Sequence, residues 1–356
     1  MDFVLTQSFF DFAVDCGPST VDRLAITSHV GNIFYIMTSS PRYYIAVMRS
    51  FCLFVLSLML LSCAHEPYTR VFHSGKRLSN LKNKKLKEIS GLVASRANPG
   101  YLWVHNDGGN PAEVYLVDLA LNVRLTCTFP EAENRDWEDI AIGAGPDPDK
   151  TYLYIGDIGD NQERKSFKTV FRFEEPRVNG LEALVIRPEE RAVNTDRITF
   201  RLEDGSKDME AMIIDPSSKD ILLISKRENP AYVYNLVVPE HIQDTLVAKR
   251  TAQLNIPGIT AADVSPDGKE LLVKRYNRIY YWRTDSVKPL AQWITQMPIP
   301  VRYKRELQGE ALGWDVEGNG FYTLSEKPLA IRTPLFYHRK RMLNQKREEI
   351  MVASPQ

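Results

Sequence analysis

One short pattern recurs along the chain and constrains its fold more than any other feature. Each copy starts with polar or acidic residues, passes through a small residue and ends in two or three apolar residues. The copies are Glu88–Ala94, Asp136–Ile142, Asp208–Ile214, Thr260–Pro266 and Gln308–Trp314. A unit that repeats at a fixed period of roughly 20 to 50 residues is typical of propellers and solenoids, because a single unit cannot bury its apolar face alone.

Further apolar runs follow each copy, and turn-forming residues separate them. The second runs are Tyr101–Asp107, Tyr152–Asp157, Ile221–Arg227, Glu270–Arg275 and Gly320–Glu326, and the third runs are Val114–Asp118, Val170–Phe173, Val233–Val237, Ile279–Trp282 and Leu335–His338. Fourth runs follow at Arg124–Phe129, Arg197–Leu202, Ala248–Leu254 and Leu290–Ile294. These runs are short and rich in β-branched and aromatic residues, so they predict strands.

We therefore expect an all-β fold, with a single β-propeller over residues 87–338. Five blades match the five copies, and six blades are the alternative because Glu174–Asp196 lengthens the second unit. The last unit lacks a fourth strand before the basic, flexible C-terminal tail 339–356. We expect residues 69–73 to close the ring by pairing with the last blade, since propellers limit exposed sheet edges through such closure.

Residues 48–63 bear on where the protein resides. Arg49 precedes an apolar run from Phe51 to Leu61, which is too short to span a bilayer, and the run ends at Cys63. The segment resembles a secretory signal with the lipobox of bacterial lipoprotein precursors. The alternative is a buried hydrophobic helix of an intracellular protein.

The lipobox resemblance implies a division of the N-terminal region. Residues 1–47 would be an upstream extension or a misassigned start, 48–62 the signal peptide, and 63–86 the lipidated cysteine, a tether and the closing strand. Lipidation of Cys63 with more than one acyl chain would give stable membrane anchoring. Ala64 follows the cysteine, so the resemblance favours export to the outer membrane of a Gram-negative bacterium.

Charge and cysteine content exclude two classes of protein. The chain has 45 basic and 45 acidic residues, whereas a dedicated nucleic-acid binder has a strong basic excess. Of the four cysteines, only Cys127 lies in the expected propeller, so no disulfide framework is predicted. We therefore expect no nucleic-acid partner, and a core held by apolar burial and sheet hydrogen bonds.

Acidic residues gather at the start of the repeats, which we expect to form the channel mouth. Aligning the copies places Ser90, Glu138, Glu210, Ala262 and Glu310 in one column. Carboxylates around one axis are costly unless positive charge offsets them. Hard oxygen ligands of the kind that Ca²⁺ prefers are available at Asn106, Asp107, Asp136, Glu138, Asp139, Asp157, Asp160 and Asn161. The alternative is that these are solvated aspartates of surface turns.

Basic residues end the second runs of the third and fourth units. Lys226 and Arg227, with Lys274 and Arg275, occupy places where earlier units carry Asn106, Asp107 and Asp157. A mouth acidic on one side and basic on the other suits a polar ligand with an anionic group. The expected ligand-binding residues are Glu210, Lys226, Arg227, Arg275, Glu310 and His105. The alternative is that the basic residues simply pair with Glu210 and Glu310.

The motifs around Glu88, Trp103, Asp136, Tyr154 and Gly309 together resemble a group of uncharacterised secreted bacterial propeller proteins. More distantly the chain is similar to the phytase-like esterase and gluconolactonase propellers. The resemblance implies a divalent cation at the channel mouth, with Glu138, Asp157 and Asn106 as matching ligands. Fold similarity alone does not transfer function.

Three functional hypotheses follow. The first is a lipid-anchored propeller that binds a polar small molecule or saccharide at a Ca²⁺-dressed mouth. The second is a metal-assisted esterase or lactonase with Asp157 or Glu138 as the catalytic general base. The third is a scaffold lipoprotein that faces an envelope protein.

Overall fold

A computed structural model describes residues 71–179, 189–242, 244–326 and 333–341, which belong to one compact unit of the chain. The expected all-β class is confirmed, because the elements of this unit are strands together with the short 3-10 helix η2 (Leu290–Gln292). Among these residues, no helix has the length and apolar character needed to cross a bilayer.

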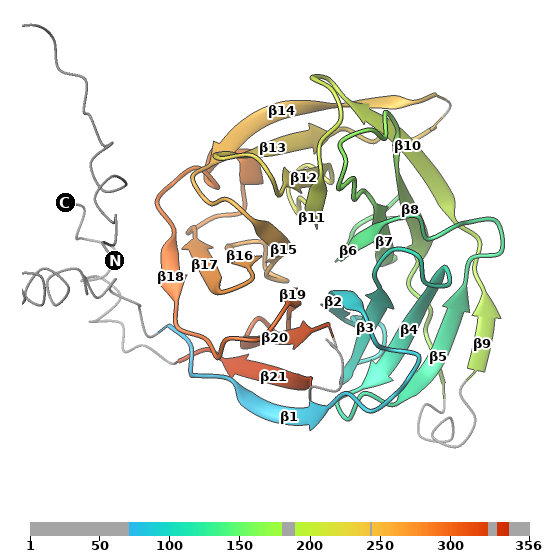
Figure 1. The fold of residues 1–356 in the computed structure, drawn as a ribbon, viewed down its shortest axis with the longest axis vertical. Helices are drawn as coiled ribbons and strands as arrows, with labels where there is room; N and C mark the ends of the chain where they lie inside the picture. The colour runs from blue at the N-terminus through green and yellow to red at the C-terminus, as the bar shows by residue number, and fades with distance from the viewer. Residues whose placement is uncertain (1–70, 180–188, 243, 327–332, 342–356) are drawn as a thin grey trace, which may run out of the picture. The chain divides into compact units, whose positions relative to one another are not determined.

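The strands form four sheets (Figure 1). The first sheet contains, in spatial order, β2 (Ile89–Ala94), β3 (Tyr101–Asn106), β4 (Glu113–Asp118), β5 (Val123–Thr128) and β9 (Glu189–Ala192). The third contains β15 (Ile259–Val264), β16 (Glu270–Arg275), β17 (Arg278–Arg283) and β18 (Ile299–Val301). The fourth contains β19 (Gly309–Trp314), β20 (Gly320–Ser325), β21 (Pro334–Arg339) and β1 (Lys76–Asn80).

The second sheet has eight strands and consists of two four-stranded groups. One group is β6 (Trp137–Gly143), β7 (Tyr152–Asp157), β8 (Lys168–Glu174) and β10 (Asp196–Leu202). The other is β11 (Met209–Ile214), β12 (Ile221–Ser225), β13 (Ala231–Leu236) and β14 (Leu246–Leu254). The outermost strands β10 and β14 pair in parallel, which joins the two groups.

Five strands, which we call the inner strands, surround a common centre. They are β2, β6, β11, β15 and β19; each contacts the next, and β19 contacts β2. Figure 1 shows the remaining strands of each group lying progressively further from this centre. The first strand of every repeat therefore faces the centre, so residues at its start can meet residues from other repeats.

Every inner strand carries a β-bulge at the same level. The register shifts at Ser90, Glu138, Glu210, Thr260 and Glu310, each of which is the extra residue opposite the second strand of its group. This corrects the sequence alignment of the fourth copy, because Thr260 and not Ala262 occupies the glutamate column. Bulges bend a strand and re-aim a side chain, and here they direct one residue from each repeat toward one end of the centre.

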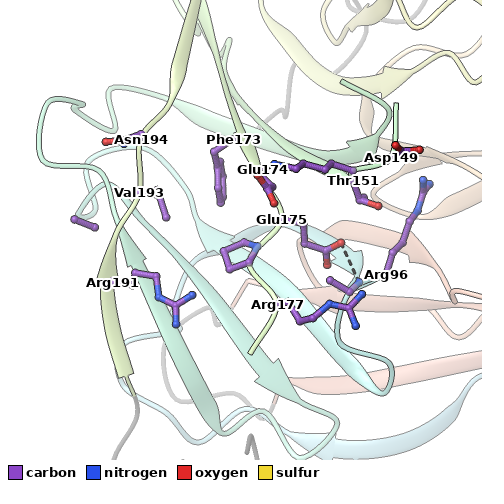
Figure 2. A pocket seen from close by; sticks show the side chains of 14 residues that line it. Arg96, Asp149, Thr151, Phe173, Glu174, Glu175, Arg177, Arg191, Val193 and Asn194 are labelled. Atoms are coloured by element: carbon purple, nitrogen blue, oxygen red, sulfur yellow. Dashed lines mark hydrogen bonds and ion pairs between the residues drawn. The ribbon is translucent and has the colours of Figure 1, made fainter. Parts of the chain in front are cut away.

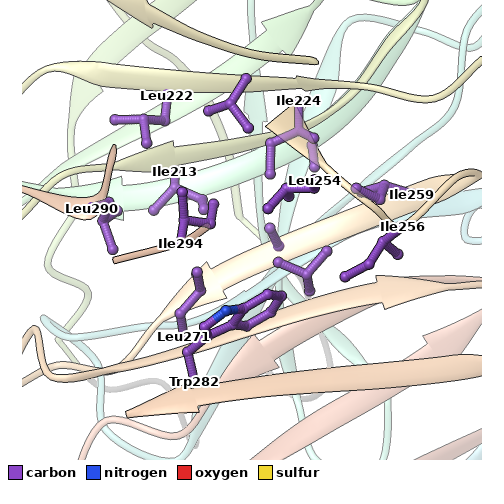
Figure 3. Close-up of a cluster of buried hydrophobic side chains, with 14 of the residues drawn as sticks. Ile213, Leu222, Ile224, Leu254, Ile256, Ile259, Leu271, Trp282, Leu290 and Ile294 are labelled. Atoms are coloured by element: carbon purple, nitrogen blue, oxygen red, sulfur yellow. The ribbon is translucent and has the colours of Figure 1, made fainter. Parts of the chain in front are cut away.

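Apolar clusters fill the spaces between neighbouring groups of strands. Figure 3 shows one of them, in which Ile213 and Leu222 from β11 and β12 pack against Leu271 and Trp282 from β16 and β17. The expected fourth strand at Leu290–Ile294 was wrong. This segment forms η2 and the turn after it, since Leu290, Trp293 and Ile294 at helical spacing fill the same cluster. The strand that pairs with β17 is β18.

Closure of the fourth sheet takes place slightly later in the chain than expected. β1 pairs antiparallel with β21. Residues 69 and 70 of the expected segment 69–73 lie outside the described residues, and its described part, 71–73, forms an antiparallel bridge between Phe72 and Lys340. The long segment Glu174–Asp196 also has a role of its own. It leaves the second sheet, and β9 within it pairs in parallel with β5 of the first sheet.

Candidate functional site

The bulges bring carboxylates from different repeats together at one end of the centre. Asp107, Asp136 and Glu138 each offer an oxygen within 4.8 Å of the others, and Glu138, Asp208 and Glu210 form a second such group. We call these the first and second triads. Asp107 follows β3, whereas Asp136 and Asp208 precede inner strands, so chain ends at the same edge of the fold supply both triads.

Glu138 belongs to both triads and is the most unusual carboxylate in the cluster. Its residue is 6% exposed, and no described residue donates a hydrogen bond to its side chain. Burial raises the pKa of Glu138 well above its usual value, and the charges of Glu210, Asp107 and Asp136 act in the same direction. A buried carboxylate surrounded by others is unfavourable without a positive partner.

Two glycines allow the polar loops to close on the first triad. A methyl group at Gly159 would lie 2.2 Å from Oε1 of Glu138, and one at Gly108 would lie 2.9 Å from Oδ1 of Asp136. Any larger residue at these positions would have to displace the carboxylates. Glycine at both positions therefore leaves the space that the carboxylates of the first triad occupy.

The second triad is already balanced by the protein's own cations. Nζ of Lys226 lies 2.6 Å from Oε1 of Glu210, and Nε of Arg227 lies 2.7 Å from Oδ2 of Asp208. The other oxygen of Asp208 accepts a hydrogen bond of 2.8 Å from the backbone N–H of Asp160. Burial raises the pKa of Glu210 to about 8 despite the opposing charge of Lys226.

The basic side of the expected mouth is therefore largely neutralised. Lys226 and Arg227 pair with carboxylates of the cluster, as the alternative interpretation predicted for Glu210. Lys274 is fully buried and pairs with Glu306 at 3.3 Å rather than with Glu310. Arg275 is partly exposed at the end of β16. The resulting site is acidic, not divided between two charges.

A rim of further polar groups adjoins the triads. The hydroxyl of Tyr276 donates a hydrogen bond of 2.9 Å to Glu310, and Nζ of Lys226 lies 5.4 Å from the centre of the Tyr276 ring. Burial raises the pKa of Glu326 to about 8, and the nearby charges of Glu310 and Asp107 act in the same direction. Burial likewise raises the pKa of Asp107 to about 6.

The loop after β7 is held by its own aspartates. The carboxylate of Asp157 accepts hydrogen bonds from Nε of Arg135 at 2.7 Å and from the backbone N–H of Asp136 at 3.0 Å. Asp160 accepts from the backbone N–H groups of Arg164 and Lys165 at 2.9 and 2.8 Å. These contacts fix the loop that carries Gly159, so both aspartates position the first triad.

Asn161 and Lys165 connect the same loop to the cluster. Asn161 accepts a hydrogen bond from Arg227, and Nζ of Lys165 lies 2.7 Å from Oδ2 of Asp136. Lys165 therefore brings a positive charge to the first triad, and it contacts one of the three carboxylates.

Three predicted site residues serve the interior of the fold instead. His105 is fully buried against Trp137, which corrects its expected place at the mouth, and burial lowers its pKa to about 4. The Asn106 amide bonds to the backbone of Glu88 and Lys85. Asp139 accepts hydrogen bonds of 2.9 and 2.8 Å from the N–H groups of Ile140 and Met212, and so links β6 to β11.

Sequence reasoning missed several members of the cluster. Asp208 starts its repeat as Asp136 does, and that correspondence was the available signal. Tyr276 follows β16 and Glu326 follows β20, at the same edge of the fold as the predicted loops. No sequence pattern marked these two residues as members of a site. Cys63, the expected lipidation site, lies outside the described residues.

Comparison with known proteins adds no functional assignment. No family model matches the chain, and no curated protein matches it.

Proposed function

We propose that residues 76–339 form a five-bladed β-propeller. Support comes from the five inner strands, each followed by outer strands of its group, and from the ring of contacts from β2 to β19 and back to β2. β1 would complete the last blade, whereas β9 would be an addition to the first. In a propeller, binding sites lie where the inner strands of several blades meet, which is where the carboxylates gather.

We propose that this propeller binds a polar ligand through one divalent cation, with Ca²⁺ the best match. The observation that carries the proposal is the buried Glu138 carboxylate, which no described residue hydrogen-bonds and which two other triad carboxylates approach. Asp107, Asp136 and Glu138 offer only oxygen atoms, the ligand type that Ca²⁺ prefers. Lys226 and Arg227 pair with two carboxylates of the second triad, whereas Lys165 pairs with one carboxylate of the first, Asp136, so the first triad is the better place for the ion.

The rim favours a ligand rich in hydroxyl groups, such as a saccharide. Glu310, Glu326 and the Tyr276 hydroxyl accept or donate hydrogen bonds, and the basic residues expected to receive an anion are paired within the protein. Ligand hydroxyls could complete the shell of the cation, because Ca²⁺ takes six to eight oxygen ligands and the triad supplies fewer.

A metal-assisted hydrolase acting on esters or lactones is the second candidate. Glu138 supports it, because burial raises the pKa of this carboxyl, and a carboxylate that binds a proton more readily is a better general base. The geometry favours Glu138 over Asp157 as the base, since hydrogen bonds from Arg135 and Asp136 engage both oxygens of Asp157. Failure of the wild type to hydrolyse a panel of esters and lactones would refute this candidate, and hydrolysis that survives Glu138→Gln would refute Glu138 as the base.

We further propose that the protein is anchored in the outer membrane through lipid at Cys63. The support is the lipobox resemblance of residues 60–63. Metabolic labelling with an alkyne-bearing fatty acid should mark the wild-type protein in the outer-membrane fraction and should fail for Cys63→Ala. Equal labelling of both forms would contradict the assignment.

Calorimetric titration tests the cation site directly. Wild-type protein freed of metal should bind one Ca²⁺, and Glu138→Gln should lose that binding because the amide keeps the shape but not the charge. Glu317→Gln, in an exposed turn beside Asn319, is the matched control and should bind as the wild type does. Absence of Ca²⁺ binding by the wild type at millimolar concentration would refute the cation proposal.

A further inference from the structure

The segment between β8 and β10 builds a second cavity that is separate from the acidic cluster. About 670 Å³ in volume, it is bounded by the two described arms of this segment, 173–177 and 191–194, and by the turns at 96–97 and 149–151. The volume lies within the range of small-molecule sites. This segment is an insertion that lengthens the second repeat, so the other repeats have no counterpart of the residues that it contributes to the cavity.

Buried hydrogen bonds hold the floor of this cavity in place. The carboxylate of Glu175 accepts from Oγ of Ser95 at 2.6 Å, Nε1 of Trp103 at 2.9 Å and the N–H of Ala97 at 3.0 Å. Figure 2 shows Glu175 in the middle of the lining, with its bond to the neighbouring turn. These bonds fix the first arm against the β2–β3 turn without any ligand.

The side chain of Asn98 hydrogen-bonds to the backbone of both neighbours of Arg177. The Asn98 amide donates a hydrogen bond of 2.8 Å to the carbonyl of Pro176 and accepts one of 2.9 Å from the N–H of Val178. The Arg177 side chain between them is exposed, and no described residue pairs with it. The fold therefore fixes the backbone of Arg177, while no described residue pairs with the charge of its side chain.

Once the internal pairs of the lining are set aside, Arg177 is a cation that no described residue pairs with. Glu174 is paired with Lys150 at 2.8 Å, and the three donors satisfy Glu175. Arg96 donates a hydrogen bond to the carbonyl of Ile142 and also interacts with the charges of Glu175 and Asp263, whereas Arg177 has no such partner among the described residues. Phe173 and Val193 add an apolar surface.

We propose that this cavity binds a small molecule carrying a phosphate or carboxylate group, with Arg177 and Arg96 as the residues that recognise the anion. Guanidinium groups match both anions in geometry and charge. The apolar lining would contact the uncharged part of the molecule. The site is independent of the cation proposal, because it shares no residue with either triad.

Calorimetric titration with inorganic pyrophosphate and with citrate tests the proposal. The buffer should be stripped of metal by resin, so that neither anion is recruited by a cation at the first triad. Wild-type protein should show saturable binding of at least one anion, and Arg177→Ser should weaken it about tenfold or more, as expected for loss of a hydrogen bond between charged groups. The exposed side chain means that Arg177→Ser should unfold at the wild-type temperature.

Two controls separate binding in this cavity from a general effect of surface charge and from binding at the triads. Arg201→Ser removes the same charge from an exposed position on β10 and should bind as the wild type does. Glu138→Gln should also bind normally. The proposal is overturned if neither anion binds saturably, if Arg177→Ser and Arg201→Ser weaken binding equally, or if only Glu138→Gln abolishes it.

Discussion

Asp263 should make the protein less stable as the pH rises through neutrality. Its carboxylate accepts hydrogen bonds of 2.9 Å from the N–H of Val264 and 2.7 Å from the N–H of Trp314, and so connects β15 to β19. Burial raises its pKa to about 7 from an ordinary value of 3.8, although these hydrogen bonds and the charge of Arg96 act in the opposite direction.

The sign of the effect follows from proton binding. Between pH 3.8 and about 7 the folded protein holds a proton at Asp263 that the unfolded chain has released. Stability therefore falls as pH rises through this window and levels off above it. For that shift, the loss between pH 5 and pH 8 is about 2 to 3 kcal/mol of unfolding free energy.

Urea unfolding of wild type and Asp263→Asn at several pH values isolates this contribution. The amide can still accept one hydrogen bond but does not titrate, so the stability difference between the two proteins should move in favour of the variant by about 2 to 3 kcal/mol from pH 5 to pH 8. A difference that stays constant, or that moves in favour of the wild type, would refute the reasoning.

Asp267→Asn is the matched control on the turn that follows. Burial alone would raise the pKa of Asp267, but hydrogen bonds from the Ser265 hydroxyl and the Lys269 N–H outweigh it and lower the pKa. This carboxyl stabilises the fold above its unfolded pKa, and the benefit disappears only as pH falls below that range. Its stability difference should therefore be flat between pH 5 and pH 8.

Three further predictions concern other parts of the molecule. In metal-free protein, Glu138→Gln should raise the melting temperature in differential scanning fluorimetry, because the amide does not ionise, whereas burial and the charges of Glu210, Asp107 and Asp136 disfavour a carboxylate there; a lower melting temperature would contradict this. Lys226→Met should change the Ca²⁺ stoichiometry in native mass spectrometry from one ion to two, because the second triad loses its internal cation; a stoichiometry that stays at one would show that Lys226 does not exclude the second ion. Glu175→Leu should lower the free energy of unfolding in urea by about 3 to 5 kcal/mol, because three buried donors lose their acceptor, whereas the exposed Glu174→Gln should change it by under about 1 kcal/mol. Equal effects of these two variants would contradict the role assigned to Glu175.

The strands were predictable because each repeat carries its own pattern. Short apolar runs bounded by turn residues located most strands within a few residues, since burial on a sheet requires that pattern. The strand prediction for Leu290–Ile294 was wrong because the apolar residues of this segment are buried at helical spacing. A run of five residues is too short to distinguish that spacing from the spacing of a strand. β1 was misplaced because Lys76–Asn80 is polar and lies at a sheet edge, where burial imposes little pattern.

The candidate site was predictable in position but less so in detail. Repeat alignment located Glu138, Glu210 and Glu310 correctly, because the bulge recurs at one place in each inner strand. It could not reveal that the same bulge shifts the fourth copy to Thr260, since a bulge inserts a residue without a sequence mark of its own. Nor could it separate carboxylates that face the cluster from Asp139, which turns toward a neighbouring strand.

The ring of five bulges separates the residues that set the charge of the cluster from the residues that pack the apolar clusters. Ser90, Glu138, Glu210, Thr260 and Glu310 occupy the bulge positions, whereas their neighbours along each inner strand supply the apolar packing. Substitution at a bulge position therefore changes the polar contacts of the cluster, and the stability that depends on them, without removing a member of the apolar clusters between groups. The charge at this end of the centre can be altered one repeat at a time, by substitution of single residues.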